Sequence, residues 1–136
     1  MGNKRLISEF YELSYNQKDY EAASAYLAPS FFDHSPVASK SREETLAAIK
    51  DVHHAFPDLE VRILDLVMED DVVVVQAFFS GTQAAPYLGV ENHGNKIEFF
   101  ALEMYRFNKM GKMIESWGYW PNQAIIEQLT RLEEEE

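Results

Sequence analysis

Three titratable side chains lie in or beside apolar stretches of this sequence, where proton-transfer chemistry is favoured. Glu103 lies among apolar residues of a predicted strand, His34 follows two phenylalanines, and Glu115 lies two residues before Trp117. Apolar surroundings disfavour the charged form of a carboxyl group and shift its pKa towards neutrality, which suits it to general acid or base catalysis. His34 could act as a base or donate to a substrate carbonyl. These three residues are our candidates for catalysis.

Each candidate also has an alternative structural role. Glu103 could act in catalysis if its strand face points inward, but it would pair with a cation such as Arg62 or Arg106 if that face points outward. His34 could instead hydrogen-bond a neighbouring loop carbonyl, and Glu115 could hydrogen-bond the adjacent hairpin strand. The pattern of residues leaves these alternatives open.

Two phenols on the first predicted helix could assist such a group. Tyr11 and Tyr15 are four residues apart and therefore lie on the same helix face. Either hydroxyl could donate to the oxygen of a developing enolate. The alternative is that both rings pack in the core or at its rim.

The elements that would position these residues follow from hydrophobic periodicity. Apolar residues at three- and four-residue steps predict helices over 3–15, 20–27, 41–56 and 122–132. Pro29 is expected to end the second of these helices, and Ser41 with Glu44 forms a capping box for the third. Apolar runs and alternating patterns predict strands over 31–34, 59–68, 72–83, 95–107 and 113–120.

Helices that precede a hairpin-rich sheet are typical of an α+β domain. We therefore expect a single domain over 1–136, with helices gathered on one face of a curved antiparallel sheet and a helix at its C-terminal end. The four glutamates of 133–136 are expected to form a frayed acidic tail. The segment 72–79 is apolar on both faces, which predicts that a second copy of the chain covers its outer face in a homodimer.

Composition excludes several classes of function. The chain has 136 residues with no cysteine, which rules out disulfides, thiolate metal sites and cysteine nucleophiles. Its 12 lysines and arginines against 23 aspartates and glutamates give a net charge of −11, which opposes binding to nucleic acid and to anionic membrane surfaces.

Other sequence signals are missing. There is no apolar stretch of the roughly 20 residues that span a bilayer, and the opening residues lack the apolar core of a signal peptide. We therefore expect a cytoplasmic protein. Adjacent His53 and His54 point to different sides of a helix, and no nucleotide-binding or calcium-loop motif is present, so we predict neither a metal nor a cofactor.

The order of these elements, together with several short motifs, resembles the SnoaL-like polyketide cyclases of the nuclear transport factor 2-like superfamily. The resemblance extends over 10–129. It rests on Phe10-Tyr11 with Asn16, Phe31-Phe32-Asp33-His34, His54-Ala55-Phe56-Pro57-Asp58-Leu59, Gly81-Thr82, Gly89, Arg106-Phe107, Gly111-Lys112, Glu115 and Trp117.

This resemblance implies a cone-shaped fold like that of ketosteroid isomerase, in which a bent sheet wraps around N-terminal helices, and it also implies a homodimer. It further implies acid–base catalysis without a cofactor on a small apolar compound that contains a carbonyl group. The residues that we expect to bind such a substrate are Tyr11, Tyr15, Phe56, Gln83, Trp117, Tyr119 and Asn122.

The chain departs from the family pattern at two positions. Gln83 stands where the family usually has histidine, and Pro121 followed by Asn122 stands where the family usually has its acid–base aspartate. Two hypotheses follow from these departures. The protein is either a cyclase or isomerase that uses other proton-handling groups, or a binding protein that has kept the hydrophobic pocket and lost the catalytic carboxylate.

Overall fold

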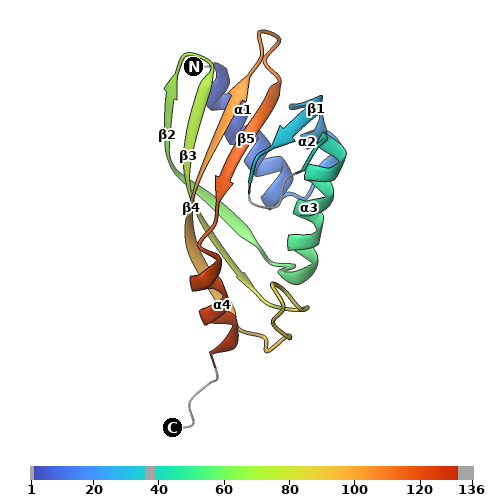
Figure 1. Ribbon diagram of the computed structural model, residues 1–136, viewed down its shortest axis with the longest axis vertical. Helices are drawn as coiled ribbons and strands as arrows, with labels where there is room; N and C mark the ends of the chain where they lie inside the picture. The colour runs from blue at the N-terminus through green and yellow to red at the C-terminus, as the bar shows by residue number, and fades with distance from the viewer. Residues whose placement is uncertain (1, 36–38, 132–136) are drawn as a thin grey trace.

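The computed structural model describes residues 2–35 and 39–131 and shows helices packed against one twisted sheet (Figure 1). In chain order the elements are α1 (Gly2–Tyr11), the π-helical turn η1 (Glu12–Asn16), α2 (Tyr20–Ser24), β1 (Leu27–Asp33), α3 (Arg42–Ala55), β2 (Glu60–Glu69), β3 (Val72–Thr82), β4 (Lys96–Phe107), β5 (Met113–Tyr119) and α4 (Asn122–Thr130). The predicted acidic tail and Leu132 lie outside the described residues.

The five strands form one mixed sheet in the order β1-β5-β4-β3-β2. Strand β1 runs parallel to β5, and the other neighbours are antiparallel. The first three helices gather beside the upper half of the sheet, and α4 lies beside the lower end of β4 (Figure 1). This arrangement confirms the predicted α+β class and the cone in which a bent sheet wraps around N-terminal helices.

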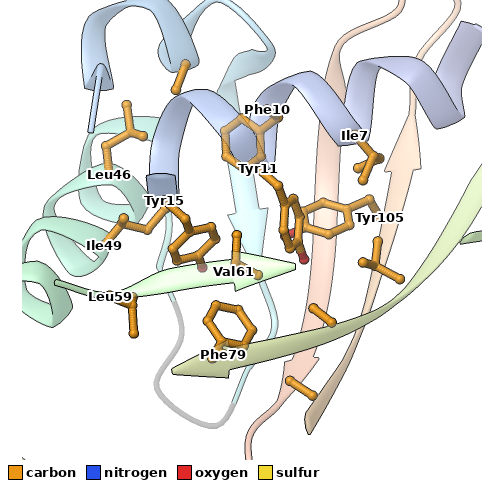
Figure 2. Close-up of a cluster of buried hydrophobic side chains, with 14 of the residues drawn as sticks. Ile7, Phe10, Tyr11, Tyr15, Leu46, Ile49, Leu59, Val61, Phe79 and Tyr105 are labelled. Atoms are coloured by element: carbon orange, nitrogen blue, oxygen red, sulfur yellow. The ribbon is translucent and has the colours of Figure 1, made fainter. Parts of the chain in front are cut away.

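The inner face of the sheet supplies most of the core. Alternate residues are buried along β3, at Val73, Val75, Ala77 and Phe79, and along β4, at Ile97, Phe99, Ala101, Glu103, Tyr105 and Phe107. Ile7, Phe10 and Tyr11 of α1 and Tyr15 of η1 pack onto this face (Figure 2). Burying these large apolar side chains is the main favourable contribution to folding.

The boundaries of two N-terminal helices differ from the prediction. Helix α2 ends at Ser24, and Pro29 lies inside β1 instead of ending a helix. Because β1 is an edge strand, it tolerates a residue without a backbone N–H group. The first predicted helix is α-helical only to Tyr11 and continues as a π-helical turn, which leaves both Tyr11 and Tyr15 buried.

The alternation of side chains that the sequence predicts over 59–68 continues through only half of β2. The register with β3 shifts between Ile63 and Asp65, which marks an irregularity of the β-bulge type. Val61 before the shift is buried, whereas Val67 after it is 59% exposed and Leu66 packs on the core instead. Uninterrupted alternation over 59–68 would predict that Val67 shares a face with Val61, and this prediction is wrong because the bulge reverses the alternation.

Asparagine is a favoured N-cap residue, so the sequence predicts Asn122 as the cap of the last helix. In the structure Asn122 is the first residue of α4, and Pro121 occupies the N-cap position. Within residues 2–35 and 39–131, the helices are all too short or too polar to cross a membrane.

The Ser41 cap of α3 is confirmed, but the Glu44 carboxylate accepts from the backbone N–H of Lys40 at 2.8 Å and not from that of Ser41, as a capping box requires. The contribution of the Ser41 cap to stability can be measured. The Ser41 hydroxyl accepts a hydrogen bond from the backbone N–H of Glu44 at 3.1 Å. We expect Ser41→Ala to lower the free energy of unfolding by about 1 kcal/mol in urea denaturation, because that N–H loses its partner. Ser8→Ala, at an exposed position of α1, is the control and should change it by less than about 0.5 kcal/mol. Equal effects of the two substitutions would contradict the assignment of the cap.

Candidate functional site

Glu103 lies on the inner face of β4 and is surrounded by hydrogen-bond donors. Its Oε1 atom accepts hydrogen bonds from the Tyr11 hydroxyl and from the Tyr105 hydroxyl, the latter at 3.3 Å. The indole Nε1 of Trp120 donates to Oε2 at 2.9 Å. With 8% of its surface exposed, Glu103 points inward, so the alternative of pairing with Arg62 or Arg106 on the outer face is excluded.

The donors come from three separate parts of the chain. Tyr11 ends α1, Tyr105 lies two residues after Glu103 on β4, and Trp120 follows β5. The Tyr11 and Tyr105 rings meet edge to face with centroids 6.0 Å apart, and their hydroxyls are 3.1 Å apart (Figure 2). Helix packing and strand pairing together therefore hold the carboxyl group in one position.

Burial determines the titration behaviour of this cluster. Burial raises the pKa of Glu103 above its ordinary value, although the hydrogen bonds from Tyr11 and Trp120 act in the opposite direction. Burial also raises the pKa of Tyr11 and of Tyr105, with the negative charge of Glu103 adding to the effect. Both phenols stay neutral around physiological pH and are available as donors.

Glu103 borders a cavity of about 290 Å³ between the helices and the sheet. Helix α3 contributes one wall through Thr45, Ala48, Ile49 and Val52, residues that share one stripe of the helix. The other lining residues are mainly aromatic or polar, and besides Glu103 they are Phe10, Tyr15, Phe31, Asp33, Ser35, Ser39, Tyr87, Leu88, Tyr105, Ser116, Trp117, Gly118, Tyr119, Trp120 and Asn122. An apolar cavity with a few polar groups is typical of a small-molecule site.

Asp33, the last residue of β1, is a second carboxylate on this cavity. Its Oδ1 atom accepts hydrogen bonds from the Ser35 hydroxyl at 2.7 Å and from the Ser116 hydroxyl at 2.9 Å. Within the described part of the chain, the histidines, aspartates and glutamates form no group of three that could hold a metal ion.

The other two predicted catalytic residues pair with each other, and neither is among the residues that line the cavity. The Nε2 atom of His34 lies 3.0 Å from Oε2 of Glu115, and the His34 ring stacks on the Trp117 ring at 4.8 Å. Glu115 also forms an ion pair with Arg106 at 3.3 Å, and Arg106 in turn reaches Asp71 at 3.0 Å. Catalytic roles for His34 and Glu115 stay predictions.

The predicted substrate-binding residues fall into two groups. Tyr15, Trp117, Tyr119 and Asn122 line the cavity, and Tyr11 reaches it through Glu103. Phe56 and Gln83 are buried beside the loop after β3 and are not among the lining residues. Phe56 packs against the Tyr87 ring, and the Gln83 amide donates to the carbonyl groups of Ala85 and Val90. Substrate binding by these two residues stays a prediction.

The sequence reasoning missed Asp33, Ser116 and the roles of Tyr105 and Trp120. Alternation along the first strand could have pointed to Asp33, because Phe31 is buried and a residue two positions later faces the same side. Ser116 and Gly118 lie on the buried face of β5 by the same rule. No local signal indicates that Trp120 reaches Glu103, since this contact depends on how the chain leaves β5.

Comparison with known families agrees with this geometry. The sequence profile of the SnoaL-like polyketide cyclases matches residues 5–129, which is nearly the whole chain. The chain belongs to this family. Among curated proteins, none matches the chain significantly.

Several solved structures resemble this SnoaL-like protein. A protein proposed to be a SnoaL-like polyketide cyclase from Jannaschia sp. CCS1 is 22% identical with a TM-score of 0.88, over 97% of this chain and 94% of that one. IdmH from Streptomyces antibioticus, proposed to be a polyketide cyclase, is 25% identical with a TM-score of 0.83, over 95% and 99%. AclR from Streptomyces galilaeus, proposed to be a hydroxylase, is 22% identical with a TM-score of 0.83, over 96% and 97%.

The raised pKa of Glu103 makes stability depend on pH. In the folded state this carboxyl binds its proton more tightly than in the unfolded chain, so its contribution to stability is lost as pH rises from the ordinary value of 4.5 through the folded pKa. The glutamine of Glu103→Gln cannot ionise. We therefore expect the free energy of unfolding of this variant to increase relative to that of the wild type as pH rises across that window. The gain is about 1.4 kcal/mol for each unit by which the pKa is raised.

Urea denaturation at a series of pH values measures this difference. Glu98→Gln is the matched control, because Glu98 lies on the same strand but is exposed. A constant difference between Glu103→Gln and the wild type over the whole window would contradict a raised pKa.

Proposed function

We propose that this protein catalyses proton transfer next to the carbonyl group of a small apolar compound, without a cofactor, and so promotes cyclisation or isomerisation. The observation that carries the proposal is the buried Glu103 carboxyl at the wall of an aromatic cavity. Membership of the SnoaL-like polyketide cyclases supports the same class of substrate, a polyketide-like or steroid-like molecule.

The surroundings of Glu103 suit it to exchange protons with a ligand. Its raised pKa keeps a proton available at higher pH than for an ordinary glutamate. Tyr11 and Tyr105 remain neutral and donate hydrogen bonds, which stabilises negative charge that develops at this end of the cavity. The lining of the cavity is mainly apolar, and a low local dielectric constant strengthens these interactions.

Glu103 also offers a substitute for the carboxylate that the family pattern has at Pro121. Asn122 lines the cavity close to the position where the sequence pattern expects that group. An amide can donate to a substrate oxygen but cannot take up a proton at neutral pH. In this proposal, the buried carboxyl group that interacts with the reacting carbonyl therefore lies on β4 and not at the end of β5, and Asn122 binds the substrate.

The proposal can be tested with 2-tetralone, an apolar bicyclic ketone with acidic α-protons. In D₂O, the wild type should accelerate the replacement of these protons by deuterium, which proton NMR measures. Glu103→Gln should reduce the catalysed rate at least about 100-fold, since one positioned acid or base contributes 10²–10⁴-fold. The exposed Glu98→Gln should exchange at the wild-type rate. Equal rates for Glu103→Gln and the wild type would contradict the proposal.

The second candidate function is a binding protein for hydrophobic ligands, and the observation that favours it is the Pro121-Asn122 pair in place of the family's aspartate. Trp117 and Trp120 line the cavity, so their fluorescence reports on ligand binding. Quenching by 2-tetralone without any catalysed exchange would favour this second function over the first.

We further propose that two copies of the chain pair through the outer face of the sheet, and we expect them to do so in the cytoplasm. Large apolar side chains are exposed on this face at Leu64, Val67, Phe100 and Leu102, with exposed fractions of 42% to 59%. The Phe78 and Phe100 rings pack against each other in the same patch, with centroids 5.1 Å apart and ring planes tilted by 54°. An exposed apolar patch on a sheet favours association.

A charge in the centre of this patch should separate the two copies. We expect the wild type to sediment as a dimer at micromolar concentration and Leu102→Glu to sediment as a folded monomer, because pairing would bury an unpaired carboxylate. Met110→Glu is the control, since Met110 is 82% exposed in the β4–β5 hairpin, away from the patch. A monomeric wild type would contradict the proposed dimer.

A further inference from the structure

The Asp33 carboxylate is held in a fixed orientation at the cavity by three donors on one oxygen. Its Oδ1 atom accepts hydrogen bonds from the Ser35 hydroxyl at 2.7 Å, the Ser116 hydroxyl at 2.9 Å and the Ser35 backbone N–H at 3.2 Å. Among the described residues, none donates a hydrogen bond to the other oxygen, Oδ2. Asp33 borders the cavity, and the three donors to Oδ1 leave Oδ2 without one among these residues.

Gly118, which has no side chain, lies between Glu103 and Ser35, the residue that donates to Asp33. A methyl group on Gly118 would lie 3.1 Å from Oε2 of Glu103 and 3.2 Å from the Ser35 hydroxyl oxygen. The Ser35 oxygen also accepts a hydrogen bond from the Gly118 N–H at 3.1 Å. Both carboxyl groups thus approach the same short stretch of β5 and border the same cavity.

Their environments differ, which favours a division of roles. Glu103 is surrounded by aromatic rings and is buried, whereas Asp33 is held by hydroxyls and is partly exposed. The negative charge of Asp33 adds to burial in raising the pKa of Glu103. Two carboxyl groups in one site whose environments differ in this way are suited to act as a base and an acid.

We propose that Asp33 is the base that removes the α-proton of the carbonyl substrate, with Ser35 and Ser116 as its positioning residues. This inference rests on the proposed function. The proton moves from the α-carbon to Oδ2 of Asp33, and the electron pair of the broken C–H bond becomes the C=C bond of an enolate. The enolate oxygen accepts a hydrogen bond from the Glu103 carboxyl in its acid form. The proton on Asp33 exchanges with solvent, and Asp33 then delivers a proton, or a deuteron in D₂O, back to the carbon, which converts the enolate into the ketone.

His34, one residue further along, is the alternative base that the sequence favours. Its imidazole stacks on Trp117 and pairs with Glu115, and it does not line the cavity. Asp33, by contrast, faces the side on which Phe31 is buried. Substituting Asp33 and His34 in separate variants therefore shows which of the two side chains is the base.

The test measures the deuterium exchange of 2-tetralone by Asp33→Asn, His34→Ala and the control Asp51→Asn. Asp51 is exposed on α3 and lies outside the cavity. We expect Asp33→Asn to lower the maximal exchange rate at least about 100-fold, while the Kd from tryptophan fluorescence changes less than about threefold, because the ketone still binds Glu103. Asp51→Asn should match the wild type.

The outcomes distinguish this inference from the proposed function. Wild-type exchange by Asp33→Asn, together with loss of exchange in Glu103→Gln, overturns the role of Asp33 and leaves the proposed function standing. Loss of exchange in His34→Ala but not in Asp33→Asn assigns the base to His34 and also overturns it. Absence of catalysed exchange in the wild type overturns the proposed function and this inference with it.

Ser116→Ala provides a second variant if Asp33→Asn fails to fold. Losing the Ser116 hydroxyl removes one of the donors that orient Asp33. We expect kcat for exchange to fall about tenfold with KM unchanged, since misplacing a base slows the chemical step more than it weakens binding. An unchanged kcat for a folded Ser116→Ala would count against Asp33 as the base.

Discussion

The buried carboxyl group of Glu103 is the constraint on which the arrangement of the site depends. A carboxyl group inside an apolar core is costly unless donors surround it or it takes up a proton. Tyr11, Tyr105 and Trp120 provide those donors. Each comes from a different element, so α1, β4 and the segment after β5 must all be in place before the group is satisfied. The same contacts form the polar end of the cavity.

The two faces of the sheet provide different environments for charge. On the inner face, a few carboxyl groups are enclosed by aromatic rings and hydroxyls. On the outer face, His34, Glu115, Arg106 and Asp71 form a chain of partly exposed ion pairs. Such pairs contribute little to stability because water screens them. The buried carboxyl group of the proposed site therefore lies on the inner face of the sheet, and the proposed dimer contact lies on the outer face.

Much of the fold could be predicted from periodicity, but the site could be predicted only in part. The alternation that groups Glu103 with Ile97 and Phe99 is visible in the sequence, and these residues are indeed buried together. Which of Asp33 and His34 points inward depends on the limits of the first strand, which begins at Leu27, earlier than apolar composition indicates. The bulge in β2 and the contact of Trp120 with Glu103 depend on tertiary packing, which periodicity does not contain.

The parallel pairing of β1 with β5 also determines how the site can be assembled. Asp33 pairs with Ser116, so the first strand of the sheet meets the last, and the cavity draws its walls from both halves of the chain. A cut in the loop between β3 and β4 would leave Asp33 in one fragment and Glu103 in the other. Neither fragment could enclose the cavity, and only their reassociation would rebuild it. The site is thus a property of the completed sheet, formed after its most distant strands have met.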